Sequence, residues 1–482
     1  MMNPVRNSKK SKSSCRTFKS SKLEGKISNG AKINPLVFRA YDIRGIYKKD
    51  IDEDLFREIG FVLGQNKEKF LVGKDIRKSG KSLARALIEG LKTSGAKVIY
   101  CGSASFGLCL FSGLKLKVDK TLFITASHLP SEWNGLKIYF GDGEPFSKEE
   151  IEKIRDEVIE IQDKKIEFKK PEIKELNLKD EYFDALLKKF PLLRNNNLKV
   201  VIDCGNGGMS LAAPELFKKF GFKIVELFCK PDPNFPNRNP EPTFEATEKL
   251  REKVIKEKAD FGVAFDGDGD RTAIIDDKGR YLNGNQIGII LGKEILPKAK
   301  EKRVIKTVAC SLAVEEELKP LGTKIIEVAV GHTYVISGCK RKKVPLGIEE
   351  SGHIVMRDYF LFDDALLVPL KIAEILLKEK KKLSDLINQI KVYPLEEITF
   401  NCPDEIKFRV IDNLTEEFKK TYEKVNTLDG VKVNFDYGWI LIRASNTSPK
   451  IRLYVEAKTK EKLNFLKEKF SQILKEKICR PR

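Results

Sequence analysis

Short strand-like runs alternate with amphipathic helical stretches from Asn34 to about residue 393, and this alternation restricts the fold more than any other feature. Apolar runs such as Lys199–Asp203 and Phe261–Phe265 have the length of buried strands, whereas Glu248–Lys258 carries its apolar residues at helical spacing. Strands separated by helices are typical of α/β layers on parallel or mixed sheets. We therefore expect several α/β domains in this part of the chain.

The pattern changes after residue 393, where two helical stretches flank short strands, which predicts a smaller α+β domain. The predicted strands are Phe70–Gly73, Lys97–Tyr100, Thr121–Thr125, Lys199–Asp203, Phe222–Leu227, Phe261–Phe265, Val304–Val308, Lys324–Val328, Val431–Phe435, Trp439–Ile442 and Ile451–Glu456. The predicted helices are Ser82–Ser94, Asp180–Lys189, Glu248–Lys258, Asn285–Ile295, Ala313–Leu318, Glu405–Tyr422 and Lys460–Lys477.

The length of 482 residues predicts more than one domain, and the net charge of +20 needs a separate explanation. Nine Lys or Arg residues and one Glu in residues 1–36 account for +8 of this charge, and the remainder is spread along the chain. No recognisable nucleic-acid-binding module accompanies it, so we expect no specific nucleic-acid partner. A basic surface also suits an enzyme that acts on phosphorylated substrates.

Two further features of composition bear on where the protein works. Residues 1–34 form a basic leader without an apolar core, which favours a disordered tail or an over-extended start over a secretory signal, with a transit peptide as the alternative. No apolar run approaches the roughly 18 residues of a membrane span. The nine cysteines include no CxxC pair, which fits reduced, buried thiols in a cytoplasmic protein.

Three carboxylates, Asp266, Asp268 and Asp270, alternate with glycines directly after the predicted strand Phe261–Phe265. The glycines allow a tight turn in which all three face one point, and such an oxygen cluster suits Mg²⁺. An EF-hand is excluded because Arg271 occupies the position of its obligatory glycine and the flanks are strand-like. A solvated acidic turn is the remaining alternative, but such a turn rarely needs three carboxylates in register.

Ser127 and His128 follow the predicted strand Thr121–Thr125, at the end of a strand where ligands collect in α/β sheets. Adjacent side chains are expected to diverge and no G-x-S-x-G elbow is present, so a hydrolase pair is not predicted. Ser-His alone is as consistent with helix capping. Beside a metal loop, a serine that carries a phosphoryl group is the better interpretation.

Two other loops carry groups that suit a phosphorylated sugar. Glu349, Ser351 and His353 offer a carboxylate, a hydroxyl and an imidazole within one turn, which fits sugar hydroxyls and proton transfer. The segment from Arg443 to Thr447 supplies a guanidinium, hydroxyls and turn N–H groups for a phosphate. Solvated loops and ordinary turns are the alternatives for both segments.

Together these segments resemble the α-D-phosphohexomutase superfamily, in its phosphomannomutase/phosphoglucomutase branch, from about Pro35 to Glu456. The motifs that carry the resemblance are Phe38–Gly45, Val72–Asp75, Ser127–Lys137, Asp203–Gly207, Asn234–Asn237, Asp266–Arg271, Glu349–His353 and Arg443–Arg452. The resemblance implies three similar mixed α/β domains, at 35–176, 177–279 and 280–392, and a smaller α+β domain at 393–478, around a central cleft.

The resemblance also implies a role for each motif. It makes Ser127 the phosphoserine, which binds one Mg²⁺ together with Asp266, Asp268 and Asp270. It places Arg44, Lys137 and Arg271 around the transferring phosphoryl group, with Lys137 as a candidate proton shuttle and His353 as a further catalytic residue. The substrate-binding residues that it implies are Tyr41, His332, Glu349, Ser351, Arg443, Ser445, Asn446 and Thr447.

The implied activity is the interconversion of hexose 6-phosphate and hexose 1-phosphate, of mannose or glucose, through a hexose 1,6-bisphosphate. Leu129 departs from the family, which usually has Asn there, and Ile348 and Ser448 are further departures that spare the metal and phosphate positions. A phosphoglucosamine mutase is the first alternative. A Mg²⁺-dependent haloacid-dehalogenase-type phosphatase, with Asp266 as nucleophile, is the second. We expect a cytoplasmic monomer or weak dimer with no membrane partner.

Overall fold

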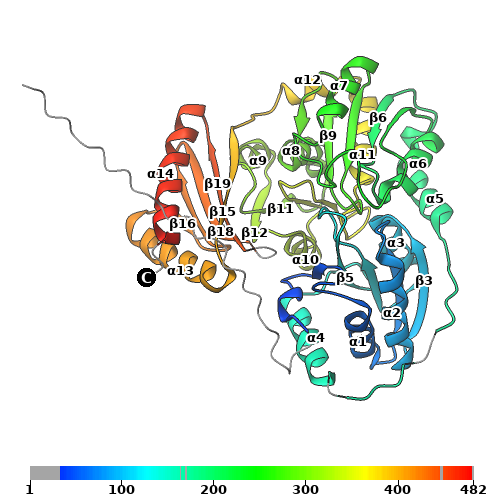
Figure 1. Ribbon diagram of the computed structural model, residues 1–482. Helices are drawn as coiled ribbons and strands as arrows, with labels where there is room; N and C mark the ends of the chain where they lie inside the picture. Colours follow the sequence, from blue (N-terminus) through cyan, green and yellow to red (C-terminus); the bar gives the residue numbers. More distant parts are fainter. Residues whose placement is uncertain (1–32, 163, 169–170, 446–448, 480–482) are drawn as a thin grey trace, which may run out of the picture.

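The computed structural model describes residues 33–162, 164–168, 171–445 and 449–479, and four separate β-sheets organise them (Figure 1). The first three sheets are mixed and the fourth is antiparallel. Each of the first three sheets contains three parallel strands, with a central strand (β2, β6 or β11) between two neighbours. An antiparallel strand (β5, β9 or β14) pairs with one of the two outer parallel strands.

The first sheet has the order β1-β5-β4-β2-β3. Its strands are β1 (Ile43–Ile46), β2 (Lys69–Lys74), β3 (Lys97–Ser103), β4 (Lys120–Ile124) and β5 (Trp133–Phe140). The helices of this domain are α1 (Glu53–Gly64), α2 (Gly80–Thr93), α3 (Phe106–Leu116) and α4 (Lys148–Ile161). Helix α4, for example, begins at a capping box that Ser147 and Glu150 form, which satisfies backbone N–H groups at the start of the helix.

The second sheet repeats this order as β10-β9-β8-β6-β7. The third, β12-β11-β13-β14, repeats four of the five strands in the opposite direction of reading and lacks the outermost one. The second domain comprises α5 (Lys179–Lys189), β6 (Lys199–Asp203), α6 (Ala213–Phe220), β7 (Lys223–Leu227), α7 (Glu248–Glu257), β8 (Phe261–Phe265), β9 (Thr272–Asp276) and β10 (Tyr281–Leu282). The third comprises α8 (Gly284–Ile295), β11 (Arg303–Thr307), α9 (Leu312–Leu318), β12 (Lys324–Val328), α10 (His332–Lys342), β13 (Leu346–Ile348), β14 (Ile354–Met356), α11 (Leu367–Glu379) and α12 (Leu383–Ile387).

The fourth sheet, of order β15-β19-β18-β17-β16, is covered by two long helices. Its elements are β15 (Leu395–Asn401), α13 (Asp404–Thr421), β16 (Val425–Asn426), β17 (Val431–Phe435), β18 (Gly438–Ala444), β19 (Lys450–Ala457) and α14 (Lys460–Cys479). Its core is separate from those of the other domains. A small apolar contact, which includes Val308, Trp439 and Tyr454, joins it to the third domain.

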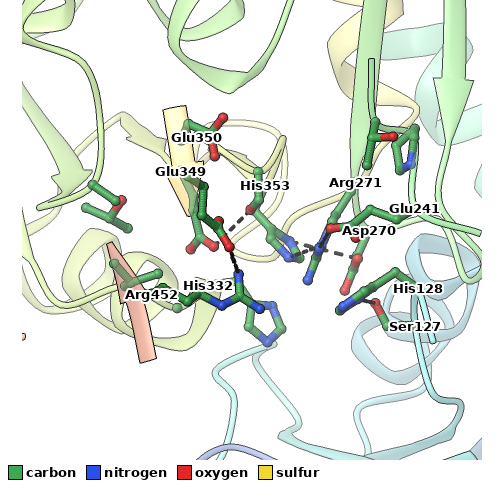
Figure 2. A pocket seen from close by; sticks show the side chains of 18 of the residues that line it. Ser127, His128, Glu241, Asp270, Arg271, His332, Glu349, Glu350, His353 and Arg452 are labelled. Carbon is green, nitrogen blue, oxygen red and sulfur yellow. Dashed lines mark hydrogen bonds and ion pairs between the residues drawn. The ribbon is translucent and has the colours of Figure 1, made fainter. Parts of the chain in front are cut away.

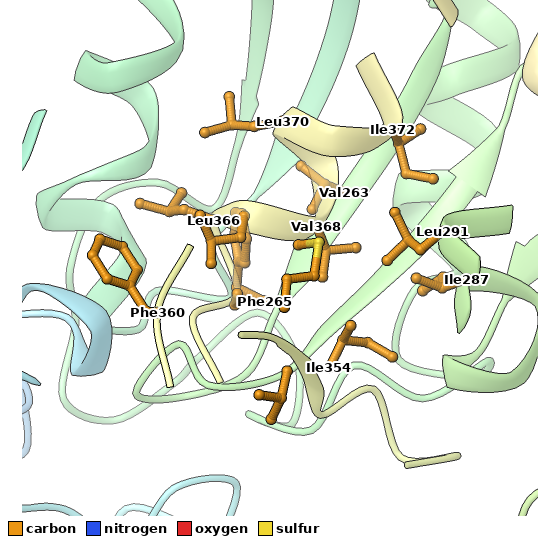
Figure 3. Close-up of a cluster of buried hydrophobic side chains, with 14 of the residues drawn as sticks. Val263, Phe265, Ile287, Leu291, Ile354, Phe360, Leu366, Val368, Leu370 and Ile372 are labelled. Atoms are coloured by element: carbon orange, nitrogen blue, oxygen red, sulfur yellow. The ribbon is translucent and has the colours of Figure 1, made fainter. Parts of the chain in front are cut away.

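One continuous apolar core connects the first three domains. Figure 3 shows the part of it in which Val263 and Phe265 of β8 pack with Ile287 and Leu291 of α8 and with α11. Helix α11 is buried along most of its length, which a helix with apolar residues on all sides requires. The three domains therefore form one packed body, to which the fourth is attached by a smaller contact.

The structure confirms the prediction of three similar α/β domains followed by a different C-terminal domain. Among the predicted elements, strands β6, β8, β12 and β17 have the predicted bounds. The elements that were not predicted include the strands β1, β5, β10, β13, β14, β15 and β16 and the helices α1, α3, α4, α10, α11 and α12. Among the described helices none is both long and apolar enough to cross a membrane.

Candidate active site

Three of the four predicted site loops occupy the same position in their domains. Each joins the third strand of the repeated order to its antiparallel neighbour: the Ser127 loop joins β4 to β5, the aspartate loop joins β8 to β9, and the Glu349 loop joins β13 to β14. The fourth, which begins at Ser445, joins β18 to β19. Each of the three domains therefore contributes a loop from the same position in its sheet, and the three loops carry different chemical groups.

The loops surround a cavity of about 610 Å³ that residues of all four domains line (Figure 2). The predicted site residues that line it are Tyr41, Arg44, Ser127, Lys137, Asp270, Arg271, His332, Glu349, Ser351, His353, Arg443 and Ser445. In Figure 2, Ser127 and His128 lie on one side and Glu349, Glu350 and Arg452 on the other. Asp266 and Asp268 are fully buried and do not line the cavity. Asn446 and Thr447 lie outside the described residues.

Ser127 has a left-handed backbone conformation, with a φ of 51°. This conformation is uncommon for residues other than glycine and persists only where the surroundings fix it. The buried guanidinium of Arg77 does so, because it donates hydrogen bonds to four carbonyl oxygens of this loop, those of Ser127, Leu129, Pro130 and Trp133. Asp75 in turn accepts from Arg77 Nε at 3.0 Å. A buried ion pair thus holds the serine in place.

The side chains of Ser127 and His128 lie together, with Ser127 Oγ 3.2 Å from His128 Nδ1. The expectation that these adjacent side chains diverge is therefore wrong, and the left-handed turn at Ser127 is the physical reason. Burial, together with the charges of Arg271 and Arg44, lowers the pKa of His128 well below its usual value. The lowered pKa favours a neutral imidazole at this contact.

The aspartate loop packs directly on the Ser127 loop. A Cβ at Gly267 would lie 2.3 Å from the carbonyl oxygen of Ser127, so only glycine fits this approach. Asp266 Oδ1 accepts the backbone N–H groups of Gly269, Asp270 and Arg271, at 2.8, 3.1 and 3.3 Å. Its other oxygen accepts from Ser127 Oγ at 3.1 Å. Asp266 is therefore both the centre of its own loop and the link to the serine.

The three aspartates fit a divalent cation. One carboxylate oxygen from each lies within 4.8 Å of the others. Asp268 Oδ1 and Asp270 Oδ1 are buried and have no hydrogen-bond partner among the described residues. Burial and the charges of Asp270 and Asp268 raise the pKa of Asp266 well above its usual value. Three buried carboxylates need several positive charges nearby, and a hard divalent cation with oxygen ligands would supply two of them.

Lys137, on β5, supplies part of that charge from the protein itself. Its Nζ lies 2.9 Å from Asp268 Oδ2 and also forms an ion pair with Asp270. Burial opposes the charged form, but the neighbouring carboxylates outweigh it and raise the pKa of Lys137. Lys137 is therefore a proton donor in this arrangement, and it bonds to two of the three predicted metal ligands.

Arg271, which ends the aspartate loop, is the start of a chain of contacts to the third domain. Its Nε donates to His353 Nε2 at 2.7 Å, so the imidazole proton of His353 is on Nδ1, which donates to Asp363. Asp363 also pairs with His332 Nδ1 at 3.1 Å. Burial lowers the pKa of His332, but the Asp363 carboxylate outweighs it and raises that pKa. His332 is the first residue of α10.

The loop of Glu349 and Ser351, called the sugar loop, and the loop between β18 and β19, called the phosphate loop, face Ser127 from the opposite side of the cavity. Glu349 accepts from Ser351 Oγ at 2.9 Å, while its other carboxylate oxygen is buried and has no partner among the described residues. Arg443 Nε donates to Asp429 Oδ2 at 2.8 Å. The same oxygen of Asp429 accepts the N–H of Val330 at 2.9 Å, which ties this arginine to the third domain.

The structure also assigns places in the site to residues that the sequence did not single out for it. Asp363, Arg77, Arg452 and Glu241 are the clearest examples. Arg452 is the Cα partner of Arg443 across β18 and β19, and its cavity-lining side chain pairs with Glu397 at 3.0 Å. Glu241 pairs with Arg271 at 3.1 Å. The acidic pair Asp363-Asp364 within an apolar stretch was a signal in the sequence, whereas Arg452 required knowledge of the strand register.

Comparison with known proteins agrees with this arrangement. Family models for the phosphoglucomutase/phosphomannomutase α/β/α domains I, II and III match residues 35–165, 180–279 and 283–393, and the model for the C-terminal domain matches residues 397–473. The boundaries predicted at 176, 279 and 392 remain predictions.

Individual relatives match along nearly their whole length. A phosphoglucomutase/phosphomannomutase of Thermococcus kodakarensis is 33% identical over 92% of this chain and 99% of its own. A probable phosphoglucosamine mutase of Methanothermobacter thermautotrophicus is 33% identical over 90% of this chain and 97% of its own. The crystal structure of a phosphoglucomutase/phosphomannomutase family protein from Burkholderia thailandensis has a TM-score of 0.83 and 28% identity, over 93% of this chain and 98% of that one. The chain therefore belongs to the phosphoglucomutase/phosphomannomutase family of the α-D-phosphohexomutase superfamily.

Proposed function

We propose that this protein is a hexose phosphate mutase, an isomerase that interconverts the 1-phosphates and 6-phosphates of mannose and glucose through phosphorylated Ser127. A hexose 1,6-bisphosphate is the intermediate and the activator. One observation carries the proposal: Ser127 Oγ lines the cavity 3.1 Å from Asp266, and the sugar and phosphate loops lie on the other side of that cavity. A phosphate donor and a sugar-phosphate site thus share one space.

The charges around Ser127 fit phosphoryl transfer, in which positioning and charge neutralisation provide most of the catalysis. Arg44, Lys137 and Arg271 line this end of the cavity and would bind the oxygens of the transferring group. One Mg²⁺ per chain, held by Ser127 with Asp266, Asp268 and Asp270, would neutralise further negative charge.

Proton transfer requires a base for the attacking sugar hydroxyl and an acid for the serine oxygen. Lys137 is protonated where it contacts the aspartates and lines the cavity with Ser127, and we infer that it returns a proton to Ser127 Oγ when the phosphoryl group leaves. His353 directs its Nδ1 proton at Asp363, and its unprotonated Nε2 accepts from Arg271 Nε; we infer that this nitrogen is the base once the sugar hydroxyl replaces Arg271 Nε as its partner. In the reverse half-reaction the two groups exchange roles.

The opposite end of the cavity would hold the part of the substrate that does not react. Glu349 and Ser351 would bind sugar hydroxyls, with Tyr41 and His332 beside them, since Glu349 has an open buried oxygen. Arg443 and Ser445, with Asn446 and Thr447, would bind the distal phosphate. A site that accepts phosphate at either end of the sugar allows the bisphosphate to turn over between two transfers.

Two alternatives predict different results. A haloacid-dehalogenase-type phosphatase needs Asp266 to attack the phosphate, but Asp266 is fully buried, accepts three backbone N–H groups and does not line the cavity. A phosphoglucosamine mutase would use the same loops on a 2-amino sugar, and a relative with such a name matches equally well. The cytoplasmic location, the monomeric or weakly dimeric state and the lack of a nucleic-acid partner remain predictions from the sequence.

The test is a set of mutase assays with mannose 1-phosphate, glucose 1-phosphate and glucosamine 1-phosphate, each with Mg²⁺ and the matching 1,6-bisphosphate. We expect the two neutral sugars to be converted with a kcat/KM well above that of the amino sugar. A preference for glucosamine 1-phosphate would replace the proposed substrate. Release of inorganic phosphate without isomerisation would replace the proposed reaction.

A further inference from the structure

Two cysteines of the second domain lie unusually close to each other. Cys204 directly follows β6 and Cys229 lies two residues after β7, the parallel neighbour of β6, in which Leu227 is the partner of Asp203. The Sγ atoms are 2.9 Å apart. A disulfide has a sulfur–sulfur distance of about 2.05 Å, so these atoms need to approach by only ~0.9 Å to form one. Both are free thiols in the structure.

The two thiols differ in their access to solvent. Cys204 is fully buried, whereas Cys229 is half-buried at the end of β7, which is the edge strand of its sheet. Burial raises the pKa of the Cys204 thiol well above its usual value, and the contact with Cys229 adds to this effect. Because the thiolate is the reactive form, an oxidant from solvent reacts first at Cys229, and Cys204 then completes the disulfide.

A second pair of cysteines in the described part of the chain provides a contrast. Cys101 and Cys109 have their Sγ atoms 3.7 Å apart, and both are buried. Neither of them gives a solvent oxidant the access that Cys229 gives. The geometry therefore singles out Cys204 and Cys229 among these two pairs.

The turn that starts at Cys204 packs on the aspartate loop of the active site. The N–H of Gly208 donates to the carbonyl oxygen of Gly267 at 2.9 Å. A Cβ at Gly207 would lie 2.7 Å from the same oxygen, so the turn and the loop are in close contact. Asn206 links the turn to the segment that carries Cys229, because its N–H donates to Phe228 O and its side chain to Lys230 O, both at 2.8 Å.

We propose that Cys204 and Cys229 form a reversible disulfide that lowers the mutase activity by displacing the aspartate loop. The oxidant is a low-molecular-weight disulfide such as oxidised glutathione. The Cys229 thiolate attacks one of its sulfurs and releases one glutathione thiol, which leaves a mixed disulfide on Cys229. The Cys204 thiolate then attacks Cys229 Sγ and releases the second glutathione, so that two protein thiols are oxidised and one glutathione disulfide is reduced.

The experiment treats the purified full-length protein with increasing oxidised glutathione and identifies its disulfides by peptide mass spectrometry without reduction. We expect a Cys204–Cys229 cross-link at lower oxidant concentration than a Cys101–Cys109 cross-link. A misplacement of 1 Å in an active site can cost on the order of 100-fold in rate. The two cysteines share the ~0.9 Å approach of their sulfurs, so we expect the aspartate loop to move by less than this and kcat to fall roughly threefold to tenfold. Dithiothreitol should restore both the free thiols and kcat.

The matched control is Cys229→Ser, which should keep the basal kcat and lose its sensitivity to oxidised glutathione. Cys101→Ser should remain as sensitive as the unmodified protein. The proposed pair is excluded if exposed Cys479 is glutathionylated while Cys204 and Cys229 remain free thiols. A complete Cys204–Cys229 disulfide that leaves kcat unchanged would contradict the coupling to the aspartate loop. The mass measurement does not depend on the proposed reaction, so failure of the mutase assay would not affect it.

Discussion

Arg443 and Arg452 are direct Cα partners on the antiparallel strands β18 and β19, and both of their side chains line the active-site cavity. Like charges that face each other across a strand pair are destabilising. Asp429 and Glu397 offset this repulsion, at 2.8 Å from Arg443 and 3.0 Å from Arg452. Two guanidiniums that face one cavity from paired strands form a suitable site for a phosphate, which arginine binds with planar, charge-assisted hydrogen bonds.

We predict that Arg443→Ala raises the KM for both hexose 1-phosphate and hexose 6-phosphate roughly tenfold to a hundredfold. This range corresponds to the 1.5–3 kcal/mol of a hydrogen bond to a charged group. The distal phosphate does not react, so kcat should fall less than KM rises. Steady-state kinetics in both directions measure this, and an unchanged KM for both sugars would remove Arg443 from the site.

Arg452→Leu is a separate test of the second guanidinium. We expect a rise in KM smaller than that of Arg443→Ala but in the same direction, because Arg452 is partly engaged by Glu397. Arg452→Lys keeps the charge and should recover only part of the affinity, since lysine lacks the planar fork. If Arg452→Leu lowers KM, the arginine opposes substrate binding and the phosphate assignment is wrong.

Metal removal should abolish activity, because the single positive charge of Lys137 does not balance the three buried aspartates. We expect full loss after treatment with a chelator and recovery on addition of Mg²⁺. Asp268→Asn should weaken Mg²⁺ binding while the melting temperature stays close to that of the unmodified protein, since Lys137 retains Asp270 as its partner. Full activity in metal-free buffer would contradict the metal assignment.

Arg77→Met should destabilise the protein by roughly 3–5 kcal/mol, because it leaves the buried carboxylate of Asp75 without its partner. It should also lower kcat, because the Ser127 loop loses its anchor. Adding Asp75→Leu should recover much of the stability but not kcat, since the loop carbonyls still lack a donor. As a surface control, Arg155→Met should cost at most about 1 kcal/mol. Recovery of kcat in the double variant would show that Arg77 acts only through stability.

Glu350 should make the stability of the folded protein depend on pH. Burial, together with the charges of Glu397 and Glu349, raises the pKa of Glu350 to about 7 from a usual value of 4.5. The protonated form therefore favours the folded state below pH 4.5, and this contribution is lost as the pH rises to about 7. Glu350→Gln should raise the free energy of unfolding by roughly 1–3 kcal/mol at pH 8 and by little at pH 4. Thermal unfolding at both pH values, with exposed Glu252→Gln as control, measures the difference. An equal gain at both pH values would contradict the assignment.

Much of the fold could be predicted because buried parallel strands have a clear pattern. The strands β6, β8 and β12 are short apolar runs between helical stretches and were predicted to the residue. Strand β5 was missed because it contains a buried lysine, Lys137, whose position makes sense only beside the aspartates of another domain. Helix α11 was missed because its apolar residues lie on all sides, which removes the helical periodicity.

The site could be predicted only as far as the sequence carries local motifs. Ser127, Glu349 and the three aspartates lie in short motifs at the ends of strands, and these motifs were enough to predict them as site residues. Asp363 gains its place in the site through its contact with His332, 31 residues away in the chain, and Arg452 through its pairing with Arg443 on the neighbouring strand. Such contacts depend on domain packing and strand register, which no local pattern encodes.

The central claim is that Ser127 carries the phosphoryl group between the enzyme and the sugar. The direct measurement is to incubate the enzyme with hexose 1,6-bisphosphate labelled with ³²P and to locate the label by peptide mapping, then to add unlabelled hexose 1-phosphate. We predict label on the Ser127 peptide, its transfer to the sugar within the time of one turnover, and no label or mutase activity in Ser127→Ala. Label on the Asp266 peptide, or mutase activity that persists in Ser127→Ala, would contradict this account.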